Sequence, residues 1–325
     1  MRSSRDEGVN WTSILGIVAI GLVTVILAVL ALNNVRGEVL NAGETPGYNP
    51  SAQDDQQSEV APSDQEEEGE EEATPAPEPV LTVPALSRVL GVQDNDVAYR
   101  ATSGACPEAG FTVETTDDGG ASWKVNGDGA EMGLSSPSRI LTGADGYVNV
   151  VAQNASNCAE IVVAQSYGYG DYWEAVTGGA NLTWHLDPTN AATAFVPQVG
   201  AVALPCEAAR ISSLSATAAS VLCNDTRLAT TSDSGANWTV SEAFPGAEAV
   251  AATADAYLVA QTGTADCAGT LLSRVNPGHA VESSACVGDA ASVGSTAVAA
   301  NAGGVAWLWA GDSIWRSTDG GISWG

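Results

Sequence analysis

A short pattern of eight residues occurs three times in this chain and restricts its fold more than any other feature. Its form is Ser/Thr-x-Asp-x-Gly-x-x-Trp, and the copies are TDDGGASW (116–123), TSDSGANW (231–238) and STDGGISW (317–324). The Asp can accept backbone N–H groups and close a tight turn, while the Gly can take the positive φ that such a turn needs. The Trp can anchor the hairpin between packed sheets. We therefore assign structural and not catalytic roles to the residues of this pattern: Thr116, Asp118, Gly120, Trp123, Thr231, Asp233, Gly235, Trp238, Ser317, Asp319, Gly321 and Trp324.

Two degenerate copies lie between the complete ones. SYGYGDYW (166–173) keeps Ser166, Gly170 and Trp173 but has Gly168 where the acid should be, and SRVNPGHAV (273–281) keeps only a Ser and a Gly. The five copies end near residues 123, 173, 238, 281 and 324, so the steps between them are 50, 65, 43 and 43 residues. Each step is long enough for one four-stranded antiparallel sheet.

The repeat resembles the Asp-box of sialidase-like, sortilin-like and photosystem-assembly-factor-like β-propellers. The resemblance implies an all-β propeller of four-stranded blades over residues 79–325. We expect about five blades, with six as the alternative, because residues 174–205 hold roughly twenty more residues than one blade requires. The segment PVLTVPA (79–85) is expected to supply the missing outer strand of the last blade and to close the ring, which would remove two free sheet edges.

Pairs of strand-like runs precede the copies. They are rich in β-branched and aromatic residues and are separated by Gly, Asn and Asp, as short antiparallel strands are. No sustained helical period occurs in this region. The expected pairs are 96–102 with 111–116, 147–153 with 160–166, 220–223 with 227–232, 256–262 with 270–275, and 305–310 with 313–317.

The N-terminal region predicts a membrane anchor. Residues 11–32 carry no charge, and a helix of 22 residues spans a hydrocarbon core of about 30 Å. Arg2 and Arg5 precede this segment and only Arg36 follows it closely, so the positive-inside rule places residues 1–10 in the cytoplasm and the rest outside. The alternative is a cleaved signal peptide, whose apolar core is usually shorter. We expect a single-pass protein of the cell membrane with an extracytoplasmic C-terminal domain.

An acidic linker is predicted over residues 33–78. Residues 51–79 contain eleven acids and no base, a composition that favours a disordered and extended spacer. A docking site for a basic partner or for divalent cations is the alternative. The net charge of −28, with only 11 basic residues, argues against nucleic acid and anionic lipid heads as partners. The single lysine, Lys124, and the abundance of Ala, Gly and Val are typical of high-GC bacterial proteins.

All six cysteines follow the predicted membrane segment. An even number of cysteines in an oxidising compartment predicts three disulfides, and six cysteines allow fifteen pairings. The chain has no Cys-x-x-Cys and only two histidines, so we expect no metal site and no cofactor. Two pairs are close in sequence and flank predicted strands of one blade, and the third pair is what remains: Cys206–Cys223, Cys267–Cys286 and Cys106–Cys158.

The resemblance to sialidases raises the question of an enzyme. That family holds a substrate carboxylate with three arginines, one of them in a Phe/Tyr-Arg-Ile-Pro motif, which this chain lacks. The nearest fragments are SRVLG (87–91) and SRILT (138–142), whose Arg88 and Arg139 recur at similar places in the repeat. Other glycosidases need two positioned carboxylates. We therefore regard a glycoside hydrolase as the disfavoured hypothesis.

A non-catalytic binding module is the favoured class. Propellers present rigid loops on which binding sites are built, and fold alone does not assign function. Our first hypothesis is a membrane-tethered scaffold or assembly factor that binds a protein of the cell envelope, and the second is a protein that binds a cell-surface glycan. Candidate ligand-binding residues are the aromatic side chains near the second copy of the repeat: Tyr167, Tyr169, Tyr172 and Trp184.

Overall fold

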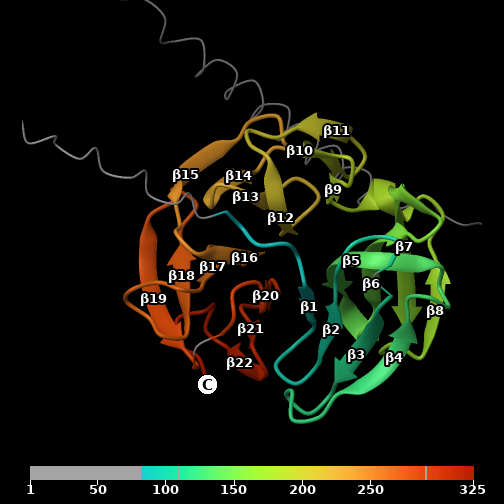
Figure 1. The fold of residues 1–325 in the computed structure, drawn as a ribbon, viewed down its shortest axis with the longest axis horizontal. Coiled ribbons are helices and arrows are strands. Elements are labelled where there is room, and N and C mark those ends of the chain that lie inside the picture. Colours follow the sequence, from blue (N-terminus) through green and yellow to red (C-terminus); the bar gives the residue numbers. More distant parts are fainter. Residues whose placement is uncertain (1–81, 109, 290) are drawn as a thin grey trace, which may run out of the picture. The chain divides into compact units, whose positions relative to one another are not determined.

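Six antiparallel sheets make up the part of the chain that the computed structural model describes, which is residues 82–108, 110–289 and 291–325 (Figure 1). Consecutive strands pair side by side in every sheet. The predicted tail (1–10), membrane helix (11–32) and linker (33–78) lie outside the described residues. No helix within the described ranges is long and apolar enough to cross a membrane.

The sheets are called blades 1–6 in chain order. Blade 1 contains β1 (Arg88–Val92), β2 (Ala98–Thr102), β3 (Thr112–Thr116) and β4 (Lys124–Asp128), and blade 2 contains β5 (Leu134–Thr142), β6 (Val148–Asn154), β7 (Asn157–Tyr167) and β8 (Tyr172–Ala175). Blade 3 contains β9 (His185–Asp187), β10 (Asn190–Val196) and β11 (Gly200–Ala203), and blade 4 contains β12 (Ala208–Ser213), β13 (Ala219–Cys223), β14 (Arg227–Thr231) and β15 (Thr239–Ala243). Blade 5 contains β16 (Ala247–Ala252), β17 (Tyr257–Gln261), β18 (Thr270–Val275) and β19 (Val281–Val287), and blade 6 contains β20 (Thr296–Ala300), β21 (Ala306–Ala310) and β22 (Ser313–Ser317). Two 3₁₀ helices, η1 (Ala144–Gly146) and η2 (Gly179–Leu182), lie in the connections.

The blades form a closed β-propeller. The first strands of blades 1, 2, 4, 5 and 6 lie nearest the centre of the ring, and β1 contacts both β5 and β20, so the last blade meets the first (Figure 1). The prediction of an all-β propeller is confirmed. The count of five blades is wrong, and the alternative of six is correct.

Blade 3 is the one that the prediction of five blades missed. It lies in the surplus residues after the second copy of the repeat. It escapes the sequence pattern because residues 183–205 contain no copy of the repeat. Its first strand, β9, is only three residues long, and the blade has three strands. The step of 65 residues between the second and third copies therefore spans two blades.

Residues 82–85, the described part of the predicted closing strand (79–85), do not form an outer strand of the last blade, and the prediction is wrong for them. Residues 82–87 form no strand, and the Val83 N–H donates to the carbonyl of Asn224 on blade 4 (3.0 Å) before the chain crosses to β1 (Figure 1). Pro84 has no N–H to contribute to a ladder. Gly325, at the outer edge of blade 6, instead exchanges two backbone hydrogen bonds with Arg316 of β22. Residues 82–87 are called the crossing segment below.

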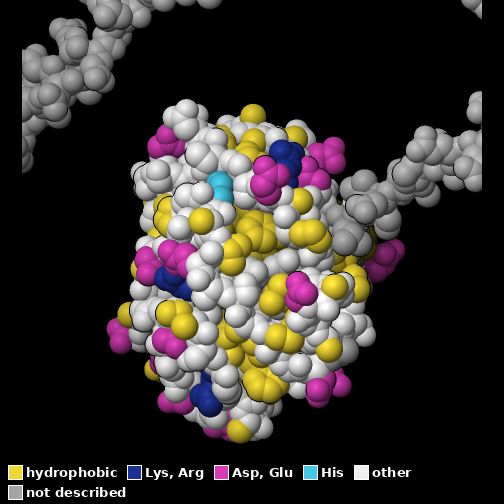
Figure 2. Space-filling model, turned by 90° about the vertical axis from the view of Figure 1, so that its left-hand side faces the viewer, with side chains coloured by type: hydrophobic (Ala, Val, Ile, Leu, Met, Phe, Trp, Pro, Cys, Tyr) yellow, Lys and Arg dark blue, Asp and Glu magenta, His cyan; other side chains and the backbone are white. Residues whose placement is uncertain are grey.

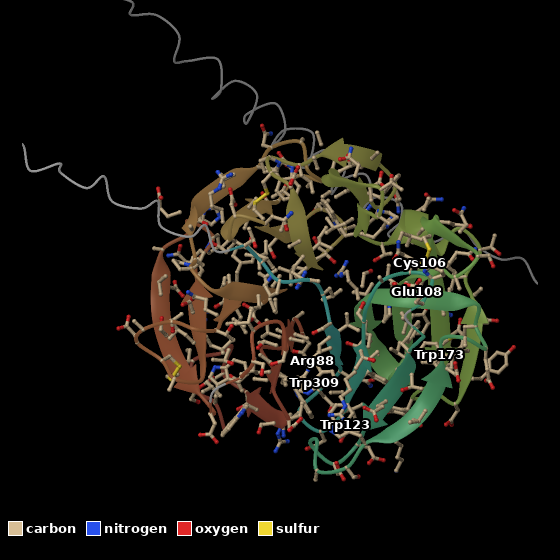
Figure 3. All side chains as sticks on the ribbon, in the orientation of Figure 1. Arg88, Cys106, Glu108, Trp123, Trp173 and Trp309 are labelled. Carbon is tan, nitrogen blue, oxygen red and sulfur yellow. A yellow bond between two sulfur atoms is a disulfide. The ribbon has the colours of Figure 1, made fainter. Side chains whose placement is uncertain are left out.

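Blades 1 and 6 are held together by aromatic packing. The Trp123 and Trp307 rings meet edge to face, with centroids 6.4 Å apart and an interplanar angle of 83°. The Arg88 guanidinium lies 4.3 Å from the ring centroid of Trp309, and Figure 3 shows both residues beside Trp123 where the two blades meet. Inner-strand side chains such as Leu90 belong to the same buried cluster. Side-chain packing therefore carries the closure of the ring.

The three complete repeats form the same hydrogen-bonded turn. In each, the Ser or Thr hydroxyl donates to the Asp at 2.7–2.9 Å and accepts the backbone N–H of the Gly at 2.9–3.1 Å. The Asp accepts the backbone N–H of the residue four positions later at 2.9 Å. The Gly residues have φ between 79° and 90°, a conformation that other residues rarely adopt.

Each of these turns packs on the preceding blade. Trp238 meets Trp184 of blade 3 edge to face at 6.4 Å, in the same way that the first turn meets blade 6. A Cβ added to Gly321 would clash with the side chain of Leu258 on blade 5. In the degenerate second copy, Trp173 donates its indole N–H to the carbonyl of Asn126 on blade 1 (2.8 Å). The repeat thus joins neighbouring blades as well as closing its own hairpin.

Acid should weaken these turns. Hydrogen bonds from the side chain four residues later lower the pKa of Asp118 and of Asp319 from 3.8 to about 2, and the pKa of Asp233 is lowered in the same way. A carboxylate whose pKa is lower in the folded state stabilises that state above its unfolded pKa, so the contribution is lost as the pH falls from about 4 toward 2. We expect the melting temperature of the wild-type protein to fall across this range in scanning calorimetry.

The matched variant replaces all three carboxylates by amides, Asp118→Asn, Asp233→Asn and Asp319→Asn. It should melt at a lower temperature at pH 7 and show a smaller further fall between pH 4 and pH 2. An equal fall in both proteins would mean that other carboxylates control the acid transition.

Three disulfides are present, as predicted. Cys106–Cys158 joins the β2–β3 connection of blade 1 to β7 of blade 2. The other two, Cys206–Cys223 and Cys267–Cys286, connect segments within blades 4 and 5, and the described residues contain no free cysteine. The longest-range bond therefore joins two blades.

Candidate functional site

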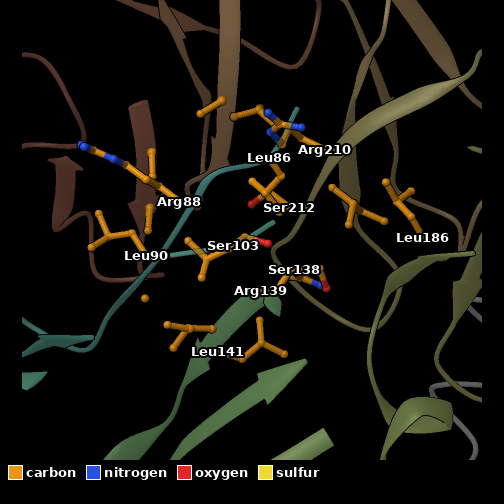
Figure 4. Close-up of a pocket in the computed structure, with 18 of the residues that line it drawn as sticks. Leu86, Arg88, Leu90, Ser103, Ser138, Arg139, Leu141, Leu186, Arg210 and Ser212 are labelled. Atoms are coloured by element: carbon orange, nitrogen blue, oxygen red, sulfur yellow. The ribbon is translucent and has the colours of Figure 1, made fainter. Parts of the chain in front are cut away.

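A cavity of about 740 Å³ lies at the centre of the ring. The inner strands β1, β5, β12, β16 and β20, the β9–β10 hairpin and the crossing segment line it. Many of the lining residues are Ala, and the larger apolar ones include Leu86, Leu90, Leu141 and Leu186 (Figure 4). Small side chains on the inner strands leave this space open, which we call the central cavity.

Three arginines border the central cavity. Arg88, Arg139 and Arg210 lie on the inner strands of blades 1, 2 and 4, each three or four residues before the end of its strand. Among the described residues that line the cavity, Asp187 is the one acid. The cavity therefore carries a net positive charge inside a protein with a net charge of −28.

Arg139 is deeply buried, with 8% of its surface exposed, and it bonds only to neutral groups. Its guanidinium donates to the carbonyl of Trp184 (2.6 Å) and to the hydroxyl of Ser213 (2.8 Å), so it connects blade 2 to blades 3 and 4. Burial lowers the pKa of Arg139 to about 10, and the group remains protonated at neutral pH.

Arg210 reaches the crossing segment. Its guanidinium donates to the carbonyls of Pro84 (2.7 Å) and of Ala209 (2.9 Å), while its Nε–H is enclosed and has no hydrogen-bond partner among the described residues. Burial lowers the pKa of Arg210 to about 10, and the nearby carboxylate of Glu248 acts in the opposite direction. Glu248 is not ion-paired with it, because its Oε1 accepts the N–H of Gly294 (2.9 Å) and the hydroxyl of Thr262.

Arg88 points away from the cavity toward blade 6 (Figure 4). It donates to the carbonyl of Gly311 and stacks on Trp309. Burial lowers its pKa, and the charge of Asp312 opposes this shift. Arg88 therefore acts mainly at the closure between the first and last blades.

The arginines of the central cavity differ from the other basic residues of the described ranges. The remaining five basic residues each form an ion pair with a carboxylate within 4.0 Å, whereas the three at the cavity form none. The exterior is rich in Asp and Glu, as Figure 2 shows for one side of the ring. The cavity thus offers positive charge and hydrogen-bond donors with no carboxylate ion-paired to them.

Among the described residues that line it, the cavity lacks the carboxylate pair that glycosidases use. Asp187 accepts the N–H (2.8 Å) and the hydroxyl (2.7 Å) of Thr189, and these bonds lower its pKa, which is opposite to what a general acid needs. No group of three His, Cys, Asp or Glu side chains in the described part of the chain could hold a metal ion. The geometry therefore gives the hydrolase hypothesis no support at this site.

The predicted aromatic patch is found on the turn between β7 and β8. Tyr167, Tyr169 and Tyr172 are exposed, with 52%, 46% and 66% of their surfaces accessible. Trp184 is not part of this surface, because it is only 1% exposed and donates its indole N–H to backbone carbonyls of Ser215 (3.0 Å) and Ala216 (3.1 Å). Its assignment as a ligand-binding residue is wrong, and Trp184 packs between blades. Residues 167–172, which include the three tyrosines, are called the tyrosine loop.

Neighbouring residues form hydrogen bonds and ring contacts with the tyrosine loop. Tyr169 has a positive φ of 66°, its N–H donates to the carbonyl of Gly146 (3.0 Å), and its carbonyl accepts the side chain of Asn126 (2.9 Å). The Tyr167 ring meets Tyr147 edge to face at 5.2 Å, and both hydroxyls contact the amide of Gln165. The aromatic surfaces are therefore exposed on a well-anchored backbone.

Arg210 is the functional candidate that the sequence analysis missed. Arg-Val at 88–89, Arg-Ile at 139–140 and Arg-Ile at 210–211 repeat at the same level of three inner strands. The first two were noticed as fragments of a motif, while the third lacks the preceding Ser. Aligning the inner strands by this Arg-aliphatic pair would have found it.

Comparisons with known proteins add little beyond the fold. No protein-family model matches the chain, and no curated protein matches it. Similar solved structures include YCF48 bound to a D1 peptide (17% identity, 77% of this chain and 74% of that chain covered, TM-score 0.29). A second is an Aleuria aurantia lectin mutant in complex with α-methyl-L-fucoside, which is 11% identical over 76% of this chain and 96% of that chain, with a TM-score of 0.48. A third is BamB from Moraxella catarrhalis, which is 9% identical over 70% of this chain and 80% of that chain, with a TM-score of 0.36. At these values the similarities assign neither family nor function, which must be argued from the residues.

Proposed function

We propose that this protein is a non-catalytic scaffold, anchored in the membrane by residues 11–32, that binds a protein of the cell envelope through the tyrosine loop. Residues 33–78 would serve as the spacer that carries the propeller away from the membrane. We further propose that the propeller belongs to the Asp-box class, on the strength of its three repeated turns.

The observation that carries this proposal is the exposure of three tyrosines on a fixed loop. Tyrosine supplies a large contact area and a hydroxyl at a small cost in side-chain entropy, and it is enriched among the residues that dominate binding energy. A loop that is already ordered loses little further entropy when it binds.

Site-specific photo-crosslinking in native membranes tests the proposal. A photo-reactive amino acid at position 172, the most exposed tyrosine, should yield one discrete protein adduct of the full-length chain. The same amino acid at position 199, where Val199 is 60% exposed on blade 3, is the matched control and should not. Tyr169→Ala should weaken the position-172 adduct by about tenfold or more, the usual effect of removing a central aromatic contact.

Failure to form an adduct at position 172, or equal adducts at both positions, would contradict the proposal. A glycan ligand is the alternative, because exposed aromatic faces also suit sugar rings. In that case the full-length protein should bind isolated cell-wall glycan, the Tyr169→Ala variant should lose this binding, and no protein adduct should form.

A further inference from the structure

Three exposed carboxylates accompany the tyrosines of the tyrosine loop. Asp171 lies within the loop, Glu174 follows it on β8, and Asp145 lies in η1, next to the glycine whose carbonyl accepts a hydrogen bond from the loop. None of the three forms an ion pair with a described residue. Given the function proposed above, on which this step rests, we infer that the partner protein binds the tyrosine loop through a basic segment, whose Arg or Lys side chains lie on the tyrosine rings and pair with these carboxylates.

Two of the carboxylates lie beside the middle of the loop. A Cβ placed on Gly168 would come within 3.8 Å of a carboxylate oxygen of Asp171, so this side chain turns back over the loop. The ring of Tyr169 packs so closely on Gly146 that a Cβ there would meet it at 2.8 Å, and Asp145 directly precedes this glycine. A cation on the exposed part of the loop would therefore lie close to negative charge.

The third carboxylate lies beside the other aromatic pair. Glu174 is opposite Gln165 in the β7–β8 ladder, and the amide of Gln165 contacts the hydroxyls of Tyr147 and Tyr167. Burial and the neighbouring Tyr167 raise the pKa of Tyr147, and the charge of Glu174 acts in the same direction. The field of this carboxylate thus reaches the ring pair at the start of the loop.

No basic residue of the described ranges neutralises these groups. The chain contains no Lys or Arg between Arg139 and Arg210, and both of these border the central cavity. Lys124, on the outer strand of blade 1, is paired with Asp117 (3.5 Å). A basic segment of a partner would therefore meet carboxylates that no basic side chain of this part of the chain already occupies, which is the charge complementarity that speeds and selects protein association.

An aromatic face and a carboxylate together form a good site for a cation. The chain itself contains this arrangement at Arg100, whose guanidinium lies 4.1 Å from the ring centroid of Trp123 and whose Nε lies 2.6 Å from the carboxylate of Glu114. The tyrosine loop presents the same two kinds of group at the surface. Arg or Lys of a partner would complete the arrangement, whereas an acidic segment or a polyanionic glycan would be repelled.

Mass spectrometry of the position-172 photo-adduct of the full-length chain tests the inference. The partner peptide joined to this position should carry Arg or Lys next to the crosslinked residue. The double variant Asp171→Asn with Glu174→Gln should lower the adduct yield by about fivefold, because two exposed charge pairs are lost. Glu131→Gln with Glu207→Gln is the matched control, since it removes the same charge from exposed residues that form no described ion pair, and it should change the yield less than about twofold.

The outcomes separate the inference from the function on which it rests. A discrete adduct whose partner peptide lacks Arg and Lys, or an equal loss of yield in the test and control pairs, would overturn the basic segment and leave the protein-binding function standing. The absence of any adduct at position 172 would overturn both. Melting temperatures establish that each variant is folded.

A synthetic probe tests the same chemistry without the native partner. A fluorescent peptide of alternating Arg and Gly is compared with one that carries citrulline, the neutral isostere, in place of Arg, by anisotropy with the full-length protein in a neutral detergent. The Arg peptide should bind more tightly, and the Asp171→Asn and Glu174→Gln pair should weaken it by about fivefold. Tyr172→Leu should weaken it by about two- to fivefold, and Tyr172→Phe, which keeps the aromatic face, should change it little. Equal binding of the two peptides, or an Arg peptide indifferent to all of these substitutions, would contradict the inference.

Discussion

Replacing Trp307 by Ala should destabilise the protein more than any other single truncation that we consider. The side chain is fully buried, meets Trp123 edge to face, and donates its indole N–H to the carbonyl of Asp94 on blade 1 (3.1 Å). Truncation of a buried Trp costs about 3–5 kcal/mol through lost packing and the cavity that remains. The melting temperature should fall by roughly 10 °C, because 1 kcal/mol corresponds to about 2–4 °C in a domain of this size.

The size of this effect depends on the position of Trp307 at the closure of the ring. The first and last blades are far apart in sequence, and the closure rests on packing and hydrogen bonds between them. Losing these contacts exposes the facing surfaces of blades 1 and 6 at once. The ring should therefore open between these two blades before other blades separate. Hydrogen exchange in the Trp307→Ala variant should accordingly be fastest in β1–β3 and β20–β22.

Two control variants distinguish loss of the contacts between blades 1 and 6 from a general loss of stability. Trp307→Phe keeps most of the ring packing and loses the hydrogen bond, and it should cost about 1–2 kcal/mol. Ile322→Ala, in the neighbouring turn, removes a side chain that is 57% exposed and should change the melting temperature little. If Trp307→Ala cost no more than Ile322→Ala, aromatic packing would not be what closes the ring.

The local chemistry of the repeat explains how much of this fold could be predicted. The Asp and Gly of each copy determine a turn through contacts within eight residues, so the pattern reports the turn wherever it occurs. The predicted strand pairs correspond to the second and third strands of blades 1, 2, 4, 5 and 6. These strands carry the alternating β-branched and aromatic residues that make a strand visible in sequence.

The inner strands and blade 3 could not be predicted in the same way. Segments such as β16 (AEAVAA) and β20 (TAVAA) are rich in Ala because they face the central cavity, and Ala carries little preference for a strand. Blade 3 depends on contacts across blades, such as the packing of Trp184 on Trp238 and the bond from Arg139 to the carbonyl of Trp184. Contacts of this kind become visible only when the blades are assembled.

The two candidate sites also differ in whether a local sequence pattern can predict them. The tyrosine loop is a contiguous segment, so Tyr167, Tyr169 and Tyr172 could be proposed from sequence, whereas Trp184 was added by proximity along the chain and proved to be buried. The central cavity brings together Arg139 and Arg210, which are distant in sequence. Ring closure creates that site, and no local pattern encodes it.

Removing the disulfides should produce the second large effect. In the loop-entropy account, a cross-link stabilises the fold by restricting the unfolded chain, and the gain grows with the logarithm of the loop length. Cys106–Cys158 encloses a separation of 52 residues and should contribute about 4 kcal/mol, while Cys206–Cys223, with a separation of 17, should contribute about 3 kcal/mol. We expect the pair of substitutions Cys106→Ala and Cys158→Ala to lower the melting temperature by roughly 10 °C.

The comparison between the two bonds tests where the stabilisation acts. If restriction of the unfolded chain dominates, the Cys206→Ala and Cys223→Ala pair should be slightly less damaging than the blade-bridging pair. If packing in the folded state dominates, the order should reverse, because Cys223 is fully buried in the core of blade 4 whereas Cys106 and Cys158 are only partly buried. Reduction of the wild-type protein with a thiol should in either case lower the melting temperature by more than one pair of substitutions. If the protein purified from its native membrane showed six free thiols when it was unfolded, these bonds would be absent there, and the expected extracytoplasmic, oxidising location would be wrong.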